Sequence, residues 1–225
     1  MGLSKNPLIS LLIGIIKDIL HSKSFMGDGY EQFPKDIEKN KLFNEELKQK
    51  GLCLSVTRKW GNRTLDPTKS EWRKLREKAL FKSDFTCRFC KLRSQKWMVC
   101  DHIDGDARNN SMDNLGINCP ICDLIRHCGY HNNRLLLLKS ELDQIEIVCK
   151  TQEYWKKYRK IPKPHEIDPD AKFPDPLYDS IFEVREFANL LMRKNYSELN
   201  NDELKLRGFF GKRASPAFIK VFPEP

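Results

Sequence analysis

The 225-residue chain contains no run of about 18 apolar residues, the length that a membrane-spanning helix needs, so we expect no membrane partner. It also contains no internal repeat, which argues against a fold built from stacked repeat units. The most apolar stretch, residues 8–20, includes Lys17 and Asp18 and lacks a small-residue cleavage site. We therefore expect an amphipathic or buried helix there rather than a secretory signal.

The spacing of the cysteines separates metal binding from disulfide formation. Four of the eight cysteines form two C-x2-C pairs, Cys87 with Cys90 and Cys119 with Cys122, and the other four stand alone. Pairs at this spacing are typical of zinc sites. We therefore expect free thiols and a reducing, cytoplasmic setting.

The two pairs, with 28 residues between Cys90 and Cys119, suit one tetrahedral site in which each turn supplies two thiolates. Four thiolates leave no open position for a substrate, so the expected Zn2+ is structural. Its role would be to cross-link and stabilise a small unit whose own hydrophobic core is small.

The basic charge is concentrated in one segment. The chain has a net charge of +9, and residues 58–98 hold 13 of its 40 Lys and Arg but only four of its 31 Asp and Glu. Trp60, Trp72 and Trp97 are interleaved with these cations. Such a stripe is typical of a surface that neutralises phosphates, and a solubilising helix face is the alternative. The expected nucleic-acid contacts within it are Arg73, Lys74 and Arg88.

Turn residues and periodicity divide the chain into three parts. Residues 1–57 are expected to be a helical N-terminal extension, with a charged helix near residues 35–50. Residues 58–138 are expected to form the central domain. Residues 139–225 are expected to be a helical region, with helices near 141–160 and 180–193 and a proline-rich linker over 161–176.

The sequence predicts the order of helices and strands in the central domain. Thr68 and Glu71 are spaced as a capping box, so a helix is expected from Thr68 to about residue 82. Residues 97–100 and 114–117 are the most strand-like runs, with a turn-rich loop between them. A further helix is expected from Cys122.

The residues between the two cysteine pairs carry a motif. Asp101-His102 precedes the loop, Asn114-Leu115 follows it, and Asp123 and Arg126 stand after the second pair. This arrangement resembles the HNH endonuclease family, and the lead-in over residues 72–90 resembles that of its zinc-containing members. The resemblance covers about residues 70–130. It implies an α+β fold, in which a small ββα-metal (HNH) unit is stapled by the four-cysteine zinc site and flanked by mainly helical extensions.

The resemblance also implies roles for individual residues. His102 would be the general base that removes a proton from the attacking water, and Asp101 would ligate a divalent ion. Asn114 would hold the two strands and orient the histidine. Because adjacent strand residues point to opposite faces, Asp101 and His102 can serve one site only if the strand is distorted there.

One position departs from the family pattern. Asp123 stands where the family usually has His or Asn as the second ligand, and two carboxylates would favour Mg2+ or Mn2+. His127, four residues later, is the alternative second ligand, and His131 is a weaker candidate. Arg126 would add a phosphate contact, with a solvated helix residue as the alternative.

The sequence therefore predicts a metal-dependent endonuclease that hydrolyses DNA phosphodiester bonds. The alternative is a non-catalytic zinc module that binds nucleic acid through the basic stripe. A homodimer would allow double-strand cutting, because one active site cuts one strand at a time.

Overall fold

The computed structural model describes residues 37–57, 64–66, 68–174 and 183–223. The described residues form one compact unit, and the helix expected at residues 8–20 lies outside them. The first part of the basic stripe, residues 58–63 with Trp60, also lies outside them. Within the described residues, no helix combines the length and the apolar character needed to cross a membrane.

Among the described residues, two helices precede the first strand. Helix α2 (Ile37–Gln49) confirms the charged helix expected near residues 35–50. Helix α3 (Ser70–Lys82) ends as predicted but begins later, with Lys69 as its N-cap and no capping box. The predicted capping role of Thr68 is wrong, because its amide and its hydroxyl both donate to Asp66 Oδ1 at 2.8 Å in a turn before the helix.

The middle of the chain forms two strands and a helix. Strand β1 (Val99–His102) pairs antiparallel with β2 (Leu115–Asn118), and Asp101 lies opposite Gly116. A Cβ atom at Gly116 would come within 2.8 Å of the Arg88 side chain, so the glycine leaves room for that arginine against the β1–β2 sheet. Helix α4 (Pro120–Arg126) follows directly, two residues earlier than predicted, because Cys119 caps it and Pro120 suits its first turn.

A second two-stranded sheet, β3 (Leu135–Lys139) with β4 (Leu206–Phe210), was not predicted. The strands pair antiparallel, although most of the C-terminal region separates them along the chain. Strand β3 crosses the expected limit at residue 138, and β4 lies in a region expected to be helical. Each strand has only five residues, which is too short for a clear alternating pattern. No local sequence signal therefore predicts this sheet.

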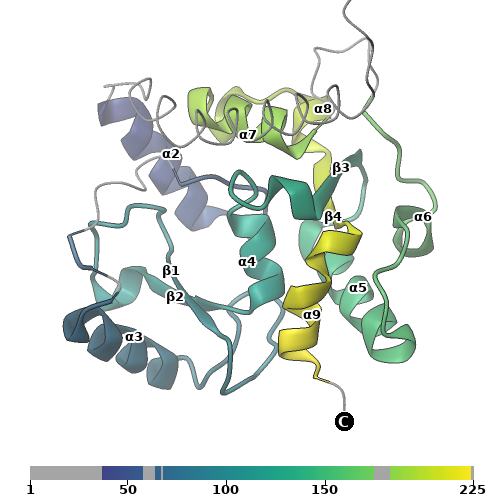
Figure 1. Cartoon of the computed structure of the whole chain (residues 1–225). Helices are drawn as coiled ribbons and strands as arrows, with labels where there is room; N and C mark the ends of the chain where they lie inside the picture. The colour runs from purple at the N-terminus through teal and green to yellow at the C-terminus, as the bar shows by residue number, and fades with distance from the viewer. Residues whose placement is uncertain (1–36, 58–63, 67, 175–182, 224–225) are drawn as a thin grey trace, which may run out of the picture. The chain divides into compact units, whose positions relative to one another are not determined.

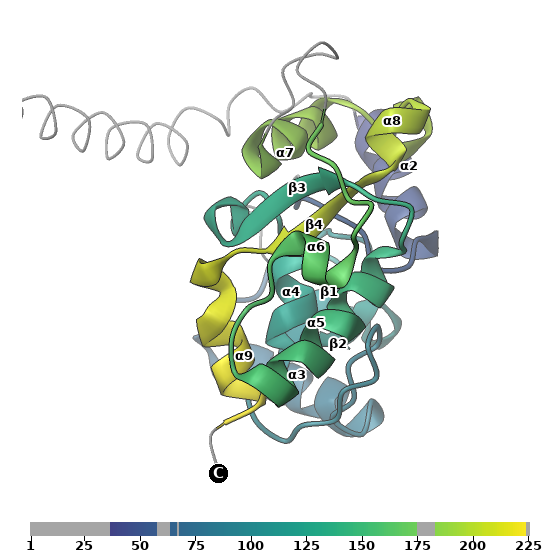
Figure 2. The ribbon, with the colours of Figure 1, turned by 90° about the vertical axis from the view of Figure 1, so that its right-hand side faces the viewer.

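Among the remaining helices, α5 (Gln144–Tyr158) contacts β4 and α7 (Val184–Arg193) contacts β3 of the second sheet (Figures 1 and 2). These two helices confirm the helices predicted near 141–160 and 180–193. The proline-rich segment contains the short helix α6 (Pro164–Ile167). Helix α8 (Asn201–Leu204) precedes β4, and the short 3-10 turn η4 (Lys212–Ala214) leads into α9 (Ser215–Val221).

One hydrophobic core joins the three parts of the sequence. Helix α4 lies in the middle of it (Figure 1), and its Ile121 and Ile125 are fully buried. The same cluster includes Phe43 of α2, Leu191 of α7 and Phe218 of α9. The described fold is thus mixed α/β with small two-stranded sheets. The N- and C-terminal helices pack on the same core as the β1–β2 sheet.

Candidate active site

The two cysteine pairs meet in one cluster. Cys87 and Cys90 lie on the turn after α3, Cys119 is the N-cap of α4, and Cys122 lies in its first turn. Their four sulfur atoms lie within 4.8 Å of one another, with Cys90 Sγ 3.6 Å from Cys119 Sγ. Four free thiols at this spacing fit a tetrahedral metal ion, as predicted for structural zinc.

Backbone and side-chain donors orient these sulfurs. Cys119 Sγ accepts a hydrogen bond from the amide of Cys122 at 3.4 Å, and Cys90 Sγ accepts one from Gln152 Nε2 of α5 at 3.4 Å. Hydrogen bonds with Cys119 and Cys122 lower the pKa of Cys87 to about 7. Partial thiolate character suits metal binding, since the thiolate is the ligand form.

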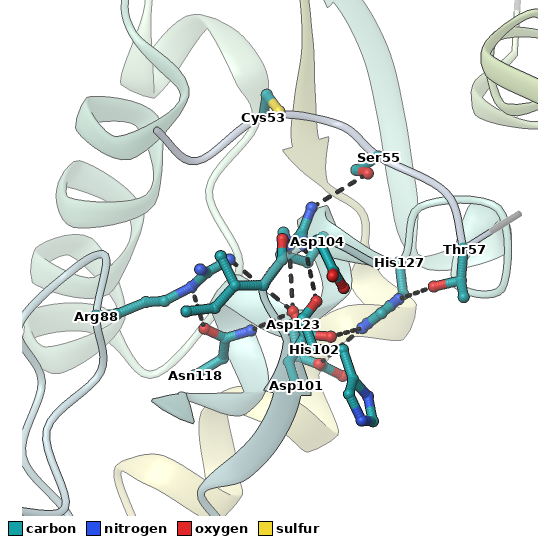
Figure 3. A network of polar contacts seen from close by, with 12 residues as sticks. Cys53, Ser55, Thr57, Arg88, Asp101, His102, Asp104, Asn118, Asp123 and His127 are labelled. Atoms are coloured by element: carbon teal, nitrogen blue, oxygen red, sulfur yellow. Dashed lines mark hydrogen bonds and ion pairs between the residues drawn. The ribbon is translucent and has the colours of Figure 1, made fainter. Parts of the chain in front are cut away.

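Asp101 is the centre of a buried charged network (Figure 3). Its Oδ2 accepts hydrogen bonds from Arg126 Nε and Asn118 Nδ2, both at 3.2 Å, and Arg88 Nη2 lies 3.9 Å away. Burial disfavours the charged form, but the guanidinium of Arg126 and the imidazole of His127 outweigh it and hold the pKa of the Asp101 carboxyl well below its usual range. Asp101 is therefore an ionised carboxylate inside the fold.

The second oxygen of Asp101 faces the candidate metal ligands of α4. His127 Nε2 lies 3.2 Å from Asp101 Oδ1 and 3.5 Å from Asp123 Oδ1, and His131 Nε2 lies 3.7 Å from Asp123 Oδ2. The helical spacing brings Asp123 and His127 to one side, where β1 presents Asp101. The structure thus gathers both alternatives for the second ligand rather than choosing one of them.

Two observations fit a cation at this cluster. Asp123 Oδ1 is buried and has no hydrogen-bond partner among the described residues, so a ligand role would satisfy it. The other ring nitrogen of His127, Nδ1, lies 3.2 Å from Thr57 Oγ1. A hydrogen bond there orients the imidazole and leaves Nε2 directed at the two carboxylates, as outer partners of metal-binding histidines do.

His102 lines the same cavity as Asp101, Asp123 and His127, a hollow of about 460 Å³. Asp101 and His102 both line the cavity although they are adjacent on β1, which ends at His102, where the amide of Gly105 donates to the His102 carbonyl at 2.9 Å. The imidazole stacks on Trp72 of α3, with ring centroids 5.5 Å apart. The helix thereby positions the predicted base.

Asn110 fixes the other side of the His102 ring. His102 Nε2 lies 3.1 Å from Asn110 Oδ1, and Asn110 Nδ2 donates to Thr64 Oγ1 at 2.7 Å. Asn110 Nδ2 also donates to the carbonyl of Arg108 at 3.3 Å, which can only accept, so the amide oxygen faces the imidazole and the hydrogen bond requires the proton on Nε2. The Nδ1 lone pair of His102 is then the basic one.

Asn114 is buried and organises the loop between the strands. Its Nδ2 donates to Asp104 Oδ1 at 2.9 Å and to the carbonyl of Asn109 at 2.8 Å, and its Oδ1 accepts from the amide of Asp104 at 3.1 Å. None of these hydrogen bonds of Asn114 reaches the imidazole of His102. Its influence on the histidine therefore passes through the loop that carries Asn110.

Of the expected phosphate contacts, Arg126 is turned inward and Arg88 is partly buried. Arg126 is 2% exposed and donates to Asp101, to Ser55 Oγ at 3.2 Å and to the carbonyls of His102 and Ile103. This corrects its assignment, because a guanidinium with these internal partners cannot also meet a solvent-borne phosphate. Arg88 is mostly buried, donates to Asn118 Oδ1 at 3.2 Å, and has its pKa lowered to about 10 by burial.

Arg73 and Lys74 are exposed on α3, as a surface contact requires. Three partners of the site were not identified from the sequence: Thr57 beside His127, Asn110 beside His102 and Gln152 beside Cys90. The composition of the loop explained Asn110 as a turn residue, and nothing local marked Thr57 or Gln152. Comparison with models of protein families and with curated proteins gives no significant match, so the assignment of a function depends on this geometry.

Proposed function

We propose that this chain is a metal-dependent HNH endonuclease that hydrolyses DNA phosphodiester bonds. The observation that carries the proposal is the convergence of Asp101, His102, Asp123 and His127 on one cavity, from a ββα arrangement beside four clustered cysteines. A zinc fold alone has no need of these four side chains. The cysteine cluster would hold structural Zn2+.

Asp101, Asp123 and His127 are the residues that would hold the catalytic ion. Two carboxylate oxygens with one imidazole nitrogen suit Mn2+ or Mg2+, and the nitrogen ligand favours Mn2+. Such an ion neutralises charge that develops on the phosphoryl and leaving oxygens. Arg126 keeps Asp101 ionised and in place, so it acts as a positioning residue.

His102 would act as the general base through Nδ1. It removes a proton from water, the water oxygen forms a bond to phosphorus, and the bond from phosphorus to the leaving 3′ oxygen breaks. The hydrogen bond from Nε2 to Asn110 then stabilises the imidazolium that forms. Trp72 restricts the ring to the orientation that this transfer needs.

Substrate binding is assigned to the exposed cations of α3, in particular Arg73 and Lys74. Arg76 and Trp72 lie on the same helix and line the cavity itself. A strand held along α3 would therefore pass His102. Since this binding is electrostatic, its affinity should fall steeply as salt is raised.

The test is incubation of the zinc-loaded protein with supercoiled plasmid and Mn2+, Mg2+ or chelator, beside the variants His102→Ala and His165→Ala. His165 is an exposed histidine of α6 and serves as the matched control. We expect nicking or linearisation that needs the ion and falls about 10²–10⁴-fold in His102→Ala only. Zinc content, fold and DNA affinity should stay unchanged in both variants.

Plasmid that is retarded but intact in every lane would contradict the nuclease proposal and support the non-catalytic zinc module. Unfolding of His102→Ala would instead show that this histidine is structural. Cleavage that persists in chelator would remove the assigned roles of Asp101, Asp123 and His127.

A further inference from the structure

A second cavity lies away from the candidate active site. It has a volume of about 510 Å³ and lies between the end of α5, the start of α6 and the η4 turn, and it shares no lining residue with the first cavity. Figure 2 shows the segment from α5 to α6 running beside α9. Four cations line it, contributed by segments far apart in the sequence: Arg159, Lys160, Lys163 and Lys212.

The residues that line the cavity carry a net positive charge. Its one carboxylate, Glu166, already accepts a hydrogen bond on each oxygen, from Tyr154 Oη and from the amide of Lys163, both at 2.6 Å. Within the described part of the chain, Lys160, Lys163 and Lys212 form no ion pair. An anion is the ligand that this wall can stabilise.

Two further groups fit an oxygen-rich anion. Arg159 donates through Nη1 to the carbonyl of Phe222 at 3.0 Å, which holds the guanidinium at the cavity by one end. The buried Trp155 also lines the cavity, and its indole N–H has no acceptor among the described residues. A tetrahedral phosphate supplies several acceptor oxygens at once.

The surroundings favour the phosphate of a nucleic acid. Tyr158, next to the cavity along α5, is about half exposed, and Lys157 Nζ lies 4.9 Å from its ring centroid. On α9, Lys220 Nζ lies 5.2 Å from the ring centroid of the exposed Trp97. Cations next to exposed aromatic rings are a combination that binds nucleic-acid strands.

We propose that this second cavity binds a backbone phosphate of the DNA, away from the phosphodiester that is cut. The proposal rests on the proposed function for the identity of the ligand. It adds a second point of attachment, which would hold the substrate without touching the cleavage chemistry.

The experiment compares full-length, zinc-loaded wild type with Lys160→Gln/Lys212→Gln and with a control of equal charge change, Lys41→Gln/Lys172→Gln. Both control lysines are exposed and neither lines the cavity. Binding of a labelled duplex is followed by fluorescence anisotropy over a range of salt concentrations. Each lost phosphate contact should lower the slope of log affinity against log salt by about 0.9.

We expect the cavity variant to lose about one such contact and severalfold in affinity at low salt, with an unchanged cleavage rate at saturating DNA. The control should change the slope by less than half as much. Equal slopes in the two variants would overturn the proposal. Saturable binding of inorganic phosphate that the cavity variant loses, with DNA binding unaffected, would assign the cavity to free phosphate and also overturn it.

The two proposals can fail separately. If the cavity variant lowers the salt dependence of DNA binding but the protein shows no cleavage, this inference is supported and the nuclease proposal is contradicted. If cleavage needs His102 but the cavity variant binds DNA like wild type, the nuclease proposal is supported and this inference is contradicted.

Discussion

The chain holds two clusters of metal-ligating side chains that differ in how their charge is balanced. The sulfurs of Cys90 and Cys119 accept hydrogen bonds from neutral donors, Gln152 and the amide of Cys122, and these donors do not neutralise the charge of four thiolates. Asp101, in contrast, is already paired with Arg126 and approached by Arg88. The cysteine cluster should therefore form only when its metal ion is bound. The Asp101 cluster should instead keep its conformation when its ion is removed.

The largest expected effect is that of Cys119→Ser. Binding of structural zinc in small sites contributes about 10–16 kcal/mol to folding, as much as the whole stability of an ordinary domain. Losing one ligand should therefore unfold the region around β1 and β2. Thermal unfolding followed by circular dichroism, with zinc stoichiometry, measures it. Cys149→Ser, the same change outside the cluster, is the control. A Cys119→Ser protein with normal zinc content and normal Tm would remove the four-cysteine site.

Arg126→Met tests the other cluster. It leaves Asp101 buried without its main partner, which should lower the free energy of unfolding by about 3–5 kcal/mol. Urea unfolding measures this, and the double variant Arg126→Met/Asp101→Asn should recover part of the loss. Arg193→Met, an exposed arginine of α7, is the control. Unchanged stability with weakened DNA binding would restore Arg126 as a phosphate contact.

The smallest expected effect separates ion binding from folding. Thr57→Val removes the partner of His127 Nδ1 and should raise the Mn2+ concentration for half-maximal cleavage about 10-fold or more, with little change in stability. Thr57→Ser, which keeps the hydroxyl, should behave as wild type. An identical Mn2+ dependence in Thr57→Val would show that this hydroxyl does not orient the histidine.

Much of the fold could be predicted because its signals are local. The positions of α2, α5 and α7 follow from stretches of helical composition, and the two strands around the loop follow from strand-like runs bounded by turn residues. The start of α3 was misplaced because Thr68 and Glu71 match a capping pattern, while Asp66 competes for the same hydroxyl. The sheet of β3 with β4 was missed because its pairing is non-local.

The sequence by itself determined the four-cysteine cluster, since two short turns fix the spacing within each pair. It also determined the order of strand, loop, strand and helix that carries Asp101, His102 and Asp123. Only the tertiary structure decided that Arg126 turns inward, that Thr57 meets His127, and that Lys160 and Lys212 share a cavity. Those contacts join distant segments, and their geometry depends on how the whole core packs around α4, which no local pattern encodes.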